Sequence, residues 1–288
     1  MTYRGRFAPS PTGLLHAGSL AAAVGSWLCA KHAHGQWLIR MEDIDPPREV
    51  AGSAAAILAA LPAFGLVADA PVIYQSSREA AYDVAFKQLK QAQLVFPCWC
   101  SRSDLAAANG IHRDGRCIAA PDPHRAPAWR MRVPDEEITF IDALQGEQRQ
   151  NLRDAVGDFV IRRVEGFYSY QLACVVDDAW QGITDVARGS DLLDSTPRQI
   201  WLQRCLGLLT PRYLHLPLVL DAEGRKLSKS ERSLEIDASD PLPALRRALA
   251  FLAIQSDQNA VNAGELLDSA LAHFDPKNLP HCSGHRLA

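Results

Sequence analysis

Residues 6–19 read RFAPSPTGLLHAGS and join two kinds of sequence. The short apolar run at residues 3–7 predicts a strand, and the alanine-rich run that follows predicts a helix. A histidine and two glycines therefore fall at a strand-to-helix turn. The first N–H groups of a helix lack partners within the helix and attract anions, while Gly13 and Gly18 allow close approach of the backbone. This turn predicts a binding site for phosphate groups.

The helix predicted over residues 20–34 leads into a second strand. It contains no proline, carries basic residues in its last turn and stops at Gly35. Residues 36–41 are a short apolar run typical of a buried strand, which completes a strand-helix-strand unit and predicts a parallel sheet. Ligands bind outside the carboxyl ends of the strands in such sheets, so Glu42 should face the same crevice as His16.

A second segment, residues 226–230, reads KLSKS. By themselves, two lysines in a short run near Gly224 are most simply a solvent-exposed turn. Paired with the turn at residues 6–19, they predict a loop that completes a site for ATP. Lys229 would neutralise charge that develops on the transferred phosphoryl group, and Lys226 is the weaker candidate for that role.

Segments spread from residue 6 to residue 230 resemble, in order and spacing, the signatures of class I aminoacyl-tRNA synthetases of the glutamate type. They are residues 6–19, 38–48, 177–178, 185–193 and 226–230. Residues 16–19 read HAGS where the idealised family motif is His-Ile-Gly-His, and Leu227 replaces the usual methionine. The leading histidine, the glycine and both lysines are kept. The resemblance implies an α/β fold with a Rossmann-like catalytic domain and its parallel sheet.

The resemblance also implies a division of the chain. The expected parts are residues 1–95, the first half of the catalytic domain; residues 96–190, an inserted α/β subdomain with a zinc-binding segment at residues 98–117 and an acceptor-binding-like region; residues 191–240, the second half with the loop Lys226–Ser230; and residues 241–288, a short helical segment. That last segment is expected to hold one helix, at residues 241–254, and a tail with little packing.

Only residues 231–288 follow the KLSKS segment, where an ordinary glutamyl-tRNA synthetase continues into anticodon-binding domains. We therefore expect a catalytic half without an anticodon-binding domain. This is the form of the glutamyl-Q tRNA(Asp) synthetases, which the chain resembles and which attach glutamate to the queuosine base in the anticodon loop of tRNA(Asp). The resemblance predicts three substrates: L-glutamate, ATP and tRNA(Asp) that carries queuosine.

The same resemblance assigns site residues. ATP is expected to contact Gly13, His16, Gly18, Ser19, Lys226, Ser228 and Lys229, of which His16 and Lys229 are the expected catalytic residues. Glutamate is expected to contact Arg6, Ser10, Glu42, Tyr170 and Arg188. Glu42 is the natural partner of the α-ammonium group, whereas guanidinium groups suit carboxylates. Tyr170 could equally belong to a packed aromatic strand at residues 167–170. Mg²⁺ is expected with ATP, held mostly by the phosphates.

Three cysteines and a histidine lie close together in sequence. They are Cys98, Cys100, His112 and Cys117, a set that can close a tetrahedral structural zinc site. The alternative is ordinary thiols and a surface histidine. The glutamyl-Q synthetases that the chain resembles carry one zinc in this insertion, commonly with tyrosine as the third ligand where this chain has His112. Histidine is the better zinc ligand, but a one-residue difference in spacing makes His112 less certain than the cysteines, and His124 is its rival. The other cysteines, which are scattered singly, are expected to be packing residues: Cys29, Cys174, Cys205 and Cys282.

Composition fits an ordinary globular enzyme, since 48% of residues are hydrophobic and 22% are charged. No run approaches the ~18 apolar residues of a membrane helix, and residues 1–10 lack a signal-peptide core, so we expect a cytoplasmic monomer that does not bind membranes. The net charge of −3 argues weakly against nucleic acid. Arginines concentrate between residues 100 and 132, where a local RNA contact and a solvated basic face are equally plausible: Arg102, Arg113, Arg116, Arg125, Arg130 and Arg132.

Three functions remain open from the sequence. The leading one is ATP-dependent activation of glutamate to glutamyl-adenylate, followed by transfer to queuosine in tRNA(Asp). The second is ordinary charging of tRNA(Glu) by a minimal synthetase. The third is a catalytically idle, zinc-containing RNA-binding or regulatory module, against which the retained His16, Glu42, Arg188 and Lys229 argue.

Overall fold

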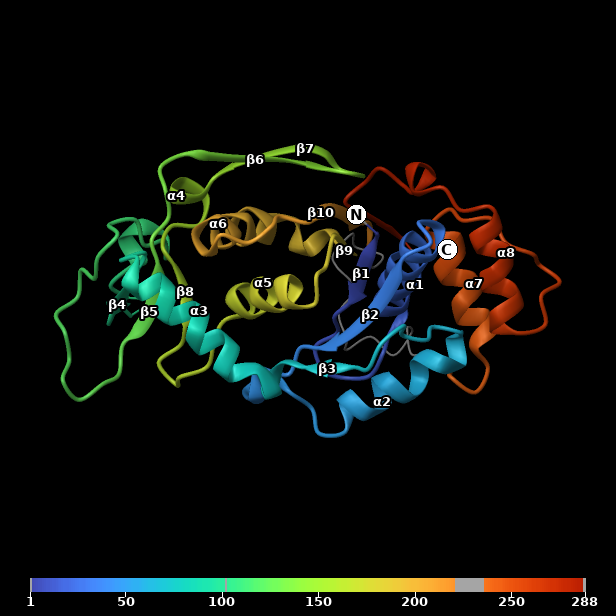
Figure 1. Ribbon diagram of the computed structural model, residues 1–288, viewed down its shortest axis with the longest axis horizontal. Helices are drawn as coiled ribbons and strands as arrows, with labels where there is room; N and C mark the ends of the chain where they lie inside the picture. The colour runs from blue at the N-terminus through green and yellow to red at the C-terminus, as the bar shows by residue number, and fades with distance from the viewer. Residues whose placement is uncertain (1, 102, 221–235, 287–288) are drawn as a thin grey trace.

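The computed structural model describes residues 2–101, 103–220 and 236–286. Parallel strands form its centre, while an antiparallel sheet and the C-terminal helices lie at opposite ends of its long axis (Figure 1). One sheet has the order β1-β2-β3, with strands β1 (Arg4–Phe7), β2 (Gln36–Met41) and β3 (Ile73–Tyr74). Another has the order β7-β6-β10-β9, with strands β6 (Glu137–Asp142), β7 (Gly146–Asn151), β9 (Asp185–Gly189) and β10 (Arg212–Leu216).

These two sheets adjoin at β1 and β9. The backbone N–H of Thr184 donates to the carbonyl oxygen of Arg4 over 3.0 Å, and the N–H of Arg4 donates to Thr184 Oγ1 over 2.8 Å. The parallel strands therefore run in the order β3-β2-β1-β9-β10. The order reverses between β1 and β9, and open α/β sheets bind ligands at such a reversal. The predicted α/β fold with a parallel sheet is confirmed.

Helix α1 (Ala17–His32) packs on this sheet, and leucine and valine side chains along it are fully buried. The helix begins earlier than the predicted residue 20 because the side chain of His16 caps it: His16 Nδ1 accepts the N–H of Ser19 over 3.4 Å. It ends before Gly35, as predicted, and the next strand has the predicted bounds.

Two adjacent aspartates on α5, Asp177 and Asp178, connect this helix to different elements. Asp177 accepts hydrogen bonds from Arg78 and Tyr82, which ties α5 to α3. Asp178 faces the other way, toward two arginines of β1 and β2. The side chains of both aspartates are nearly inaccessible to solvent, so both pairs are internal. The helices of this region are α3 (Glu79–Gln91), α5 (Tyr170–Trp180) and α6 (Thr196–Leu206).

The antiparallel sheet has the order β4-β5-β8, and the hairpin β6-β7 runs from it along the edge of the central sheet, where β6 pairs with β10 (Figure 1). Its elements, with the short helix after the hairpin, are β4 (Val95–Cys98), β5 (Ala128–Met131), α4 (Leu152–Ala155) and β8 (Phe159–Arg162). Arginines brace this region, because the guanidinium groups of four of them donate to backbone carbonyl oxygens. They are Arg113, Arg125, Arg130 and Arg132. Within the described residues none of the four forms an ion pair with a carboxylate, and Arg130 also donates to the sulfur of Cys98. An RNA contact in this region stays a prediction.

The C-terminal segment packs more tightly than we predicted. The expectation of a single helix and a loose tail is wrong, because α8 follows α7 and both Phe274 and Leu279 are buried in the central core. The last described strand, β12, pairs in parallel with β11. The elements named here are β11 (Leu218–Leu220), α7 (Pro241–Phe251), α8 (Ala263–Ala272) and β12 (Gly284–Arg286). Helix α2 (Ser53–Ala60) belongs to the first part of the chain.

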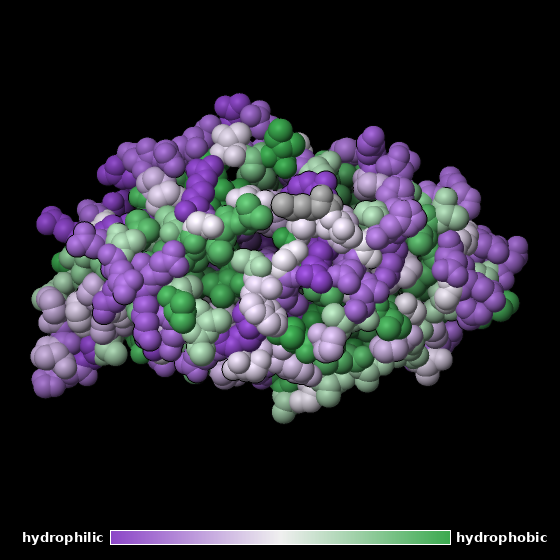
Figure 2. Space-filling model, in the orientation of Figure 1, coloured by the Kyte–Doolittle hydropathy of each residue, from purple (hydrophilic) through white to green (hydrophobic). Residues whose placement is uncertain are grey.

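Polar and apolar side chains are interspersed over the face shown in Figure 2, with hydrophilic ones around most of its periphery. In the part of the chain that the structure describes, the helices are too short or too polar to cross a membrane.

Candidate active site

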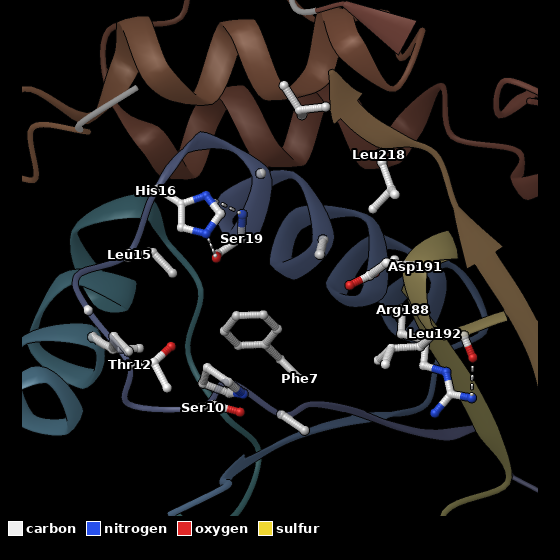
Figure 3. A pocket seen from close by; sticks show the side chains of 18 of the residues that line it. Phe7, Ser10, Thr12, Leu15, His16, Ser19, Arg188, Asp191, Leu192 and Leu218 are labelled. Carbon is white, nitrogen blue, oxygen red and sulfur yellow. Dashed lines mark hydrogen bonds between the residues drawn. The ribbon is translucent and has the colours of Figure 1, made fainter. Parts of the chain in front are cut away.

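A cavity of about 460 Å³ opens at the carboxyl ends of β1 and β9, where the strand order reverses (Figure 3). Most of the residues predicted for the site line it. From the ATP set these are Gly13, His16, Gly18 and Ser19, and from the glutamate set Arg6, Ser10, Tyr170 and Arg188. Glu42 does not line the cavity, and three residues predicted to bind ATP, Lys226, Ser228 and Lys229, lie outside the described residues.

The N-terminus of α1 forms one side of the cavity. His16 accepts the Ser19 N–H at Nδ1, so its proton lies on Nε2, which can donate to Ser19 Oγ over 2.9 Å. A Cβ atom at residue 18 would lie 3.2 Å from the His16 ring, so glycine leaves the imidazole its place there. Gly13 has a φ of 147°, in a region that residues with side chains rarely adopt. The turn therefore presents an imidazole and a helix N-terminus, which suits phosphate oxygens.

Arg188 stands on the opposite side of the cavity, across the ring of Phe7 (Figure 3). Its side chain is buried, and all five of its N–H groups have acceptors within the described residues. The acceptors are His215 Nε2 at 3.0 Å, Tyr170 Oη at 3.3 Å, Gln199 Oε1 at 2.8 Å, Leu192 O at 3.3 Å and Thr196 Oγ1 at 2.9 Å. Every one of these acceptors is uncharged when the imidazole is neutral. The positive charge of Arg188 is therefore held in place without being cancelled.

Tyr170 lines the cavity beside Arg188, whose Nη1 donates to its hydroxyl over 3.3 Å. Burial holds the pKa of its hydroxyl well above the usual range, so the hydroxyl keeps its proton. It accepts from Arg188 and still has that proton to donate to an anion in the cavity. Tyr170 begins helix α5, so the alternative of a packed strand at residues 167–170 is wrong.

A second group of arginines is arranged differently: Arg6 lines the cavity, and Arg40 lies outside its lining. Arg6 Nε lies 3.0 Å from Asp178 Oδ1, and Arg40 Nη1 lies 2.6 Å from the same oxygen. Arg40 Nη2 also contacts Glu42 Oε1 at 3.2 Å. Although burial opposes ionisation, the two guanidinium groups lower the pKa of Asp178 to about 2. Two cations and two carboxylates thus form a balanced cluster, and burial raises the pKa of Glu42 within it.

The cysteine cluster lies in the antiparallel sheet region, away from the cavity. The sulfur atoms of Cys98, Cys100 and Cys117 all lie within 4.8 Å of one another. These residues can hold a metal such as zinc, for which thiolates are preferred ligands. Arg130 Nε donates to the sulfur of Cys98 over 3.3 Å and adds a positive charge beside it.

The structure does not bring His112 into this cluster. His112 is buried, with Nδ1 at 2.9 Å from Asp158 Oδ2, and its Nε2 has no hydrogen-bond partner in the described residues. A ring nitrogen bonded to a carboxylate is the usual arrangement of a histidine that binds metal through its other nitrogen. Its role as a ligand therefore stays a prediction. The rival residue, His124, is exposed and also lies outside the cluster.

Comparison with known families gives a match to the catalytic domain of class I tRNA synthetases of the E and Q type, over residues 2–269. The chain belongs to this family. Among curated proteins it is 55% identical over 284 residues to the glutamyl-Q tRNA(Asp) synthetase of Xanthomonas campestris pv. campestris (strain 8004), a match that covers 97% of this chain and 94% of that one. It is 49% identical over 284 residues to the glutamyl-Q tRNA(Asp) synthetase of Pseudomonas aeruginosa (strain LESB58), over 98% and 97% of the two chains.

Among solved structures, this synthetase domain is similar to a glutamate-tRNA synthetase from Elizabethkingia anophelis, with a TM-score of 0.81 and 26% identity. That match covers 100% of this chain and 68% of the other. A glutamate tRNA ligase from Elizabethkingia meningosepticum, solved in complex with its amino acid, matches with a TM-score of 0.80 and 26% identity, over 100% of this chain and 67% of that one.

Several polar residues around the synthetase cavity were not predicted from the sequence. Gln199, Thr196 and His215 surround Arg188, while Arg40 and Asp178 belong to the balanced cluster. Asp178 belongs to the family signature at residues 177–178, for which the sequence predicted no specific role. His215 gave a weaker signal, as a histidine within the otherwise mostly apolar end of a strand.

Proposed function

We propose that this chain activates L-glutamate with ATP and transfers the glutamyl group to queuosine in tRNA(Asp). The observation that carries the proposal is the 55% identity over 97% of this chain to a protein named for that activity, which is itself matched over 94% of its length. The cavity supports the same function, because it places a phosphate-suited helix terminus opposite an uncancelled positive charge.

Activation needs alignment rather than a general base, because the nucleophile is already an anion. We place the side-chain carboxylate of glutamate against Tyr170 and Arg188. Glu42, which pairs with Arg40 and lies outside the lining of the cavity, stays the proposed partner of the ammonium group. His16 and the start of α1 hold the ATP phosphates, and Lys229 neutralises charge at the reacting phosphorus. An oxygen of the α-carboxylate attacks the α-phosphorus, the bond to the bridging oxygen breaks, and pyrophosphate leaves.

The second step forms an ester. A hydroxyl oxygen of the queuosine ring attacks the carbonyl carbon of glutamyl-adenylate and loses its proton. The bond between that carbon and the phosphate oxygen breaks, and AMP leaves. The electron pair of the broken bond stays on the phosphate, so no oxidant, reductant or further reactant is needed.

Two metal ions belong to the proposal in different roles. Zinc would be structural, held by Cys98, Cys100 and Cys117, with His112 as the proposed fourth ligand. Mg²⁺ would bind with ATP, mostly through the phosphates. The cytoplasmic location and the monomeric state also stay predictions.

The test is transfer of labelled glutamate, with ATP and Mg²⁺, to purified tRNA(Asp) with and without queuosine, alongside tRNA(Glu). Label on the queuosine form of tRNA(Asp) alone is the expected result. The bond should be an ester, so mild alkali should release the label. Label that also appears on tRNA(Asp) lacking queuosine would contradict the proposed acceptor.

One observation favours a second candidate, the charging of tRNA(Glu). The glutamate-tRNA synthetase from Elizabethkingia anophelis shares the fold with a TM-score of 0.81. Label on tRNA(Glu) alone would establish this candidate in place of the first. No label on any acceptor would favour the regulatory module instead.

A further inference from the structure

One contact of Arg188 differs in kind from the other four. Its Nε donates to His215 Nε2 over 3.0 Å, and this acceptor is a ring nitrogen whose ability to accept depends on the tautomer. His215 is on β10, the strand beside β9, and its side chain is fully buried. The register pairs His215 directly with Arg188. The two side chains therefore meet because of the sheet itself and not because of a loop.

This contact requires one form of the imidazole. Arginine is always protonated and donates from Nε, so Nε2 of His215 must be the acceptor and the proton must lie on Nδ1. Nδ1 lies 2.6 Å from Asp142 Oδ2 and can donate to it. Burial and the nearby charge of Arg188 lower the pKa of His215, which favours the neutral ring.

Asp142 can only act as an acceptor here. Its Oδ1 accepts the backbone N–H groups of Leu144, Gln145 and His215 over 3.0, 2.8 and 3.2 Å. Although burial opposes ionisation, the bond from His215 and these N–H groups hold the pKa of Asp142 below its usual value. An anionic oxygen therefore faces Nδ1, and the carboxylate fixes which ring nitrogen carries the proton.

We propose that Asp142 and His215 are positioning residues for glutamate binding: Asp142 fixes the tautomer of His215, and the neutral ring holds the guanidinium of Arg188 toward the cavity. The proposal rests on the proposed function, in which Arg188 receives a carboxylate of the amino acid. A carboxylate bonded directly to Arg188 would cancel the charge that the substrate needs. The intervening imidazole lets the protein orient the guanidinium with an uncharged acceptor.

An isosteric change separates orientation from packing. In Asp142→Asn the amide oxygen must stay at the Oδ1 position, because three backbone N–H groups point at it. The amide NH₂ then faces His215 Nδ1, which must become an acceptor. The ring proton moves to Nε2, which can then no longer accept from Arg188 and can donate to Thr196 Oγ1, 3.2 Å away, instead. The Nε–H of Arg188 therefore loses its acceptor. The volume of the side chain is unchanged.

The experiment measures the KM for glutamate and the KM for ATP in glutamate-dependent ATP–pyrophosphate exchange, with queuosine-containing tRNA(Asp) present, together with the Tm. Asp142→Asn and His215→Leu should each raise the glutamate KM at least about tenfold, since a buried charged donor loses its acceptor. The ATP KM should stay within about twofold, because His16 and α1 are untouched. His215→Gln, whose amide oxygen can replace Nε2 as acceptor, should recover most of the loss. His273→Gln, at an exposed histidine after α8, is the matched control.

Folded Asp142→Asn protein with an unchanged glutamate KM would overturn the proposal. If that variant does not fold, the comparison of His215→Leu with His215→Gln tests the proposal instead. Equal glutamate KM values for these two variants would overturn the proposal. The proposed function fails separately: the unaltered chain would then show no glutamate-dependent exchange. An active unaltered chain whose variants keep its KM would refute the positioning role alone.

Discussion

Buried arginines on two sides of the same cavity are treated in opposite ways. Arg6 and Arg40 contact carboxylates of Asp178 and Glu42, so their cluster is balanced before any substrate arrives. Arg188 is equally buried, yet its acceptors in the described residues are neutral. Burying an unpaired charge is costly, and it persists where a ligand supplies the missing charge. We therefore expect the balanced arginines to contribute mainly to stability and the unbalanced one to receive the charge of the substrate.

The largest effect should come from breaking the balanced cluster. Asp178→Ala leaves Arg6 and Arg40 with one carboxylate between them in a buried place, which should lower the free energy of unfolding by about 3 to 5 kcal/mol. Thermal or urea unfolding measures this loss. The control is Glu147→Ala, which removes an exposed partner of Arg149 and should cost about 0 to 1 kcal/mol. If both variants lost the same free energy of unfolding, the buried cluster would contribute no more to stability than an exposed ion pair does.

Removing the unbalanced arginine should affect binding more than folding. Arg188→Ala should reduce glutamate-dependent activation at least about tenfold, which corresponds to roughly 1.5 to 3 kcal/mol for a buried carboxylate that loses its charged donor. Measurement of kcat/KM for glutamate in pyrophosphate exchange checks this. Arg247→Ala, at an exposed arginine of α7, serves as the control. Unchanged kinetics would remove Arg188 from the substrate site.

Acid should remove the stabilisation that the ionised Asp178 carboxylate gives to the buried cluster. The pKa of Asp178 falls from 3.8 in the unfolded chain to about 2 in the folded protein. Its contribution to stability is therefore fully present above about pH 4 and is lost as the pH falls toward 2. The loss should be on the order of 2 kcal/mol. Unfolding of the unaltered chain and of Asp178→Asn at pH values from 7 down to 2.5 measures it. The stability difference between the two proteins should shrink in acid, and a constant difference would contradict the assignment.

The smallest effect on the cavity should come from the cysteine cluster. Chelation, or Cys100→Ser, should lower the Tm because the antiparallel sheet region loses a metal link. The glutamate KM should stay within about twofold, since the cluster does not line the cavity. Metal analysis of protein prepared without chelator should find about one zinc per chain. A large change in the glutamate KM would mean that the two regions are coupled.

Local signals in the sequence predicted the elements around the first motif. The second strand has the predicted bounds because an apolar run between Gly35 and Glu42 leaves few alternatives. The start of α1 was predicted three residues late, since its cap is a histidine side chain rather than one of the usual capping residues. Family motifs located both His16 and Arg188 on the cavity.

Contacts between distant residues could not be predicted in this way. Asp142 and His215 lie 73 residues apart, and nothing local to either residue indicates the other. The parallel pairing of β12 with β11 likewise depends on the whole C-terminal segment, so its tail was expected to pack loosely. The role of Asp178 emerges only when β1, β2 and α5 come together.

The position of Asp142 has a thermodynamic consequence. It is the last residue of β6, so the hairpin β6-β7 at the edge of the sheet (Figure 1) carries the carboxylate that bonds to His215. A macromolecule that displaced this hairpin on docking would tilt the imidazole and change the affinity for the amino acid. Linkage makes the effect mutual: glutamate would then alter the affinity of that macromolecule by the same factor.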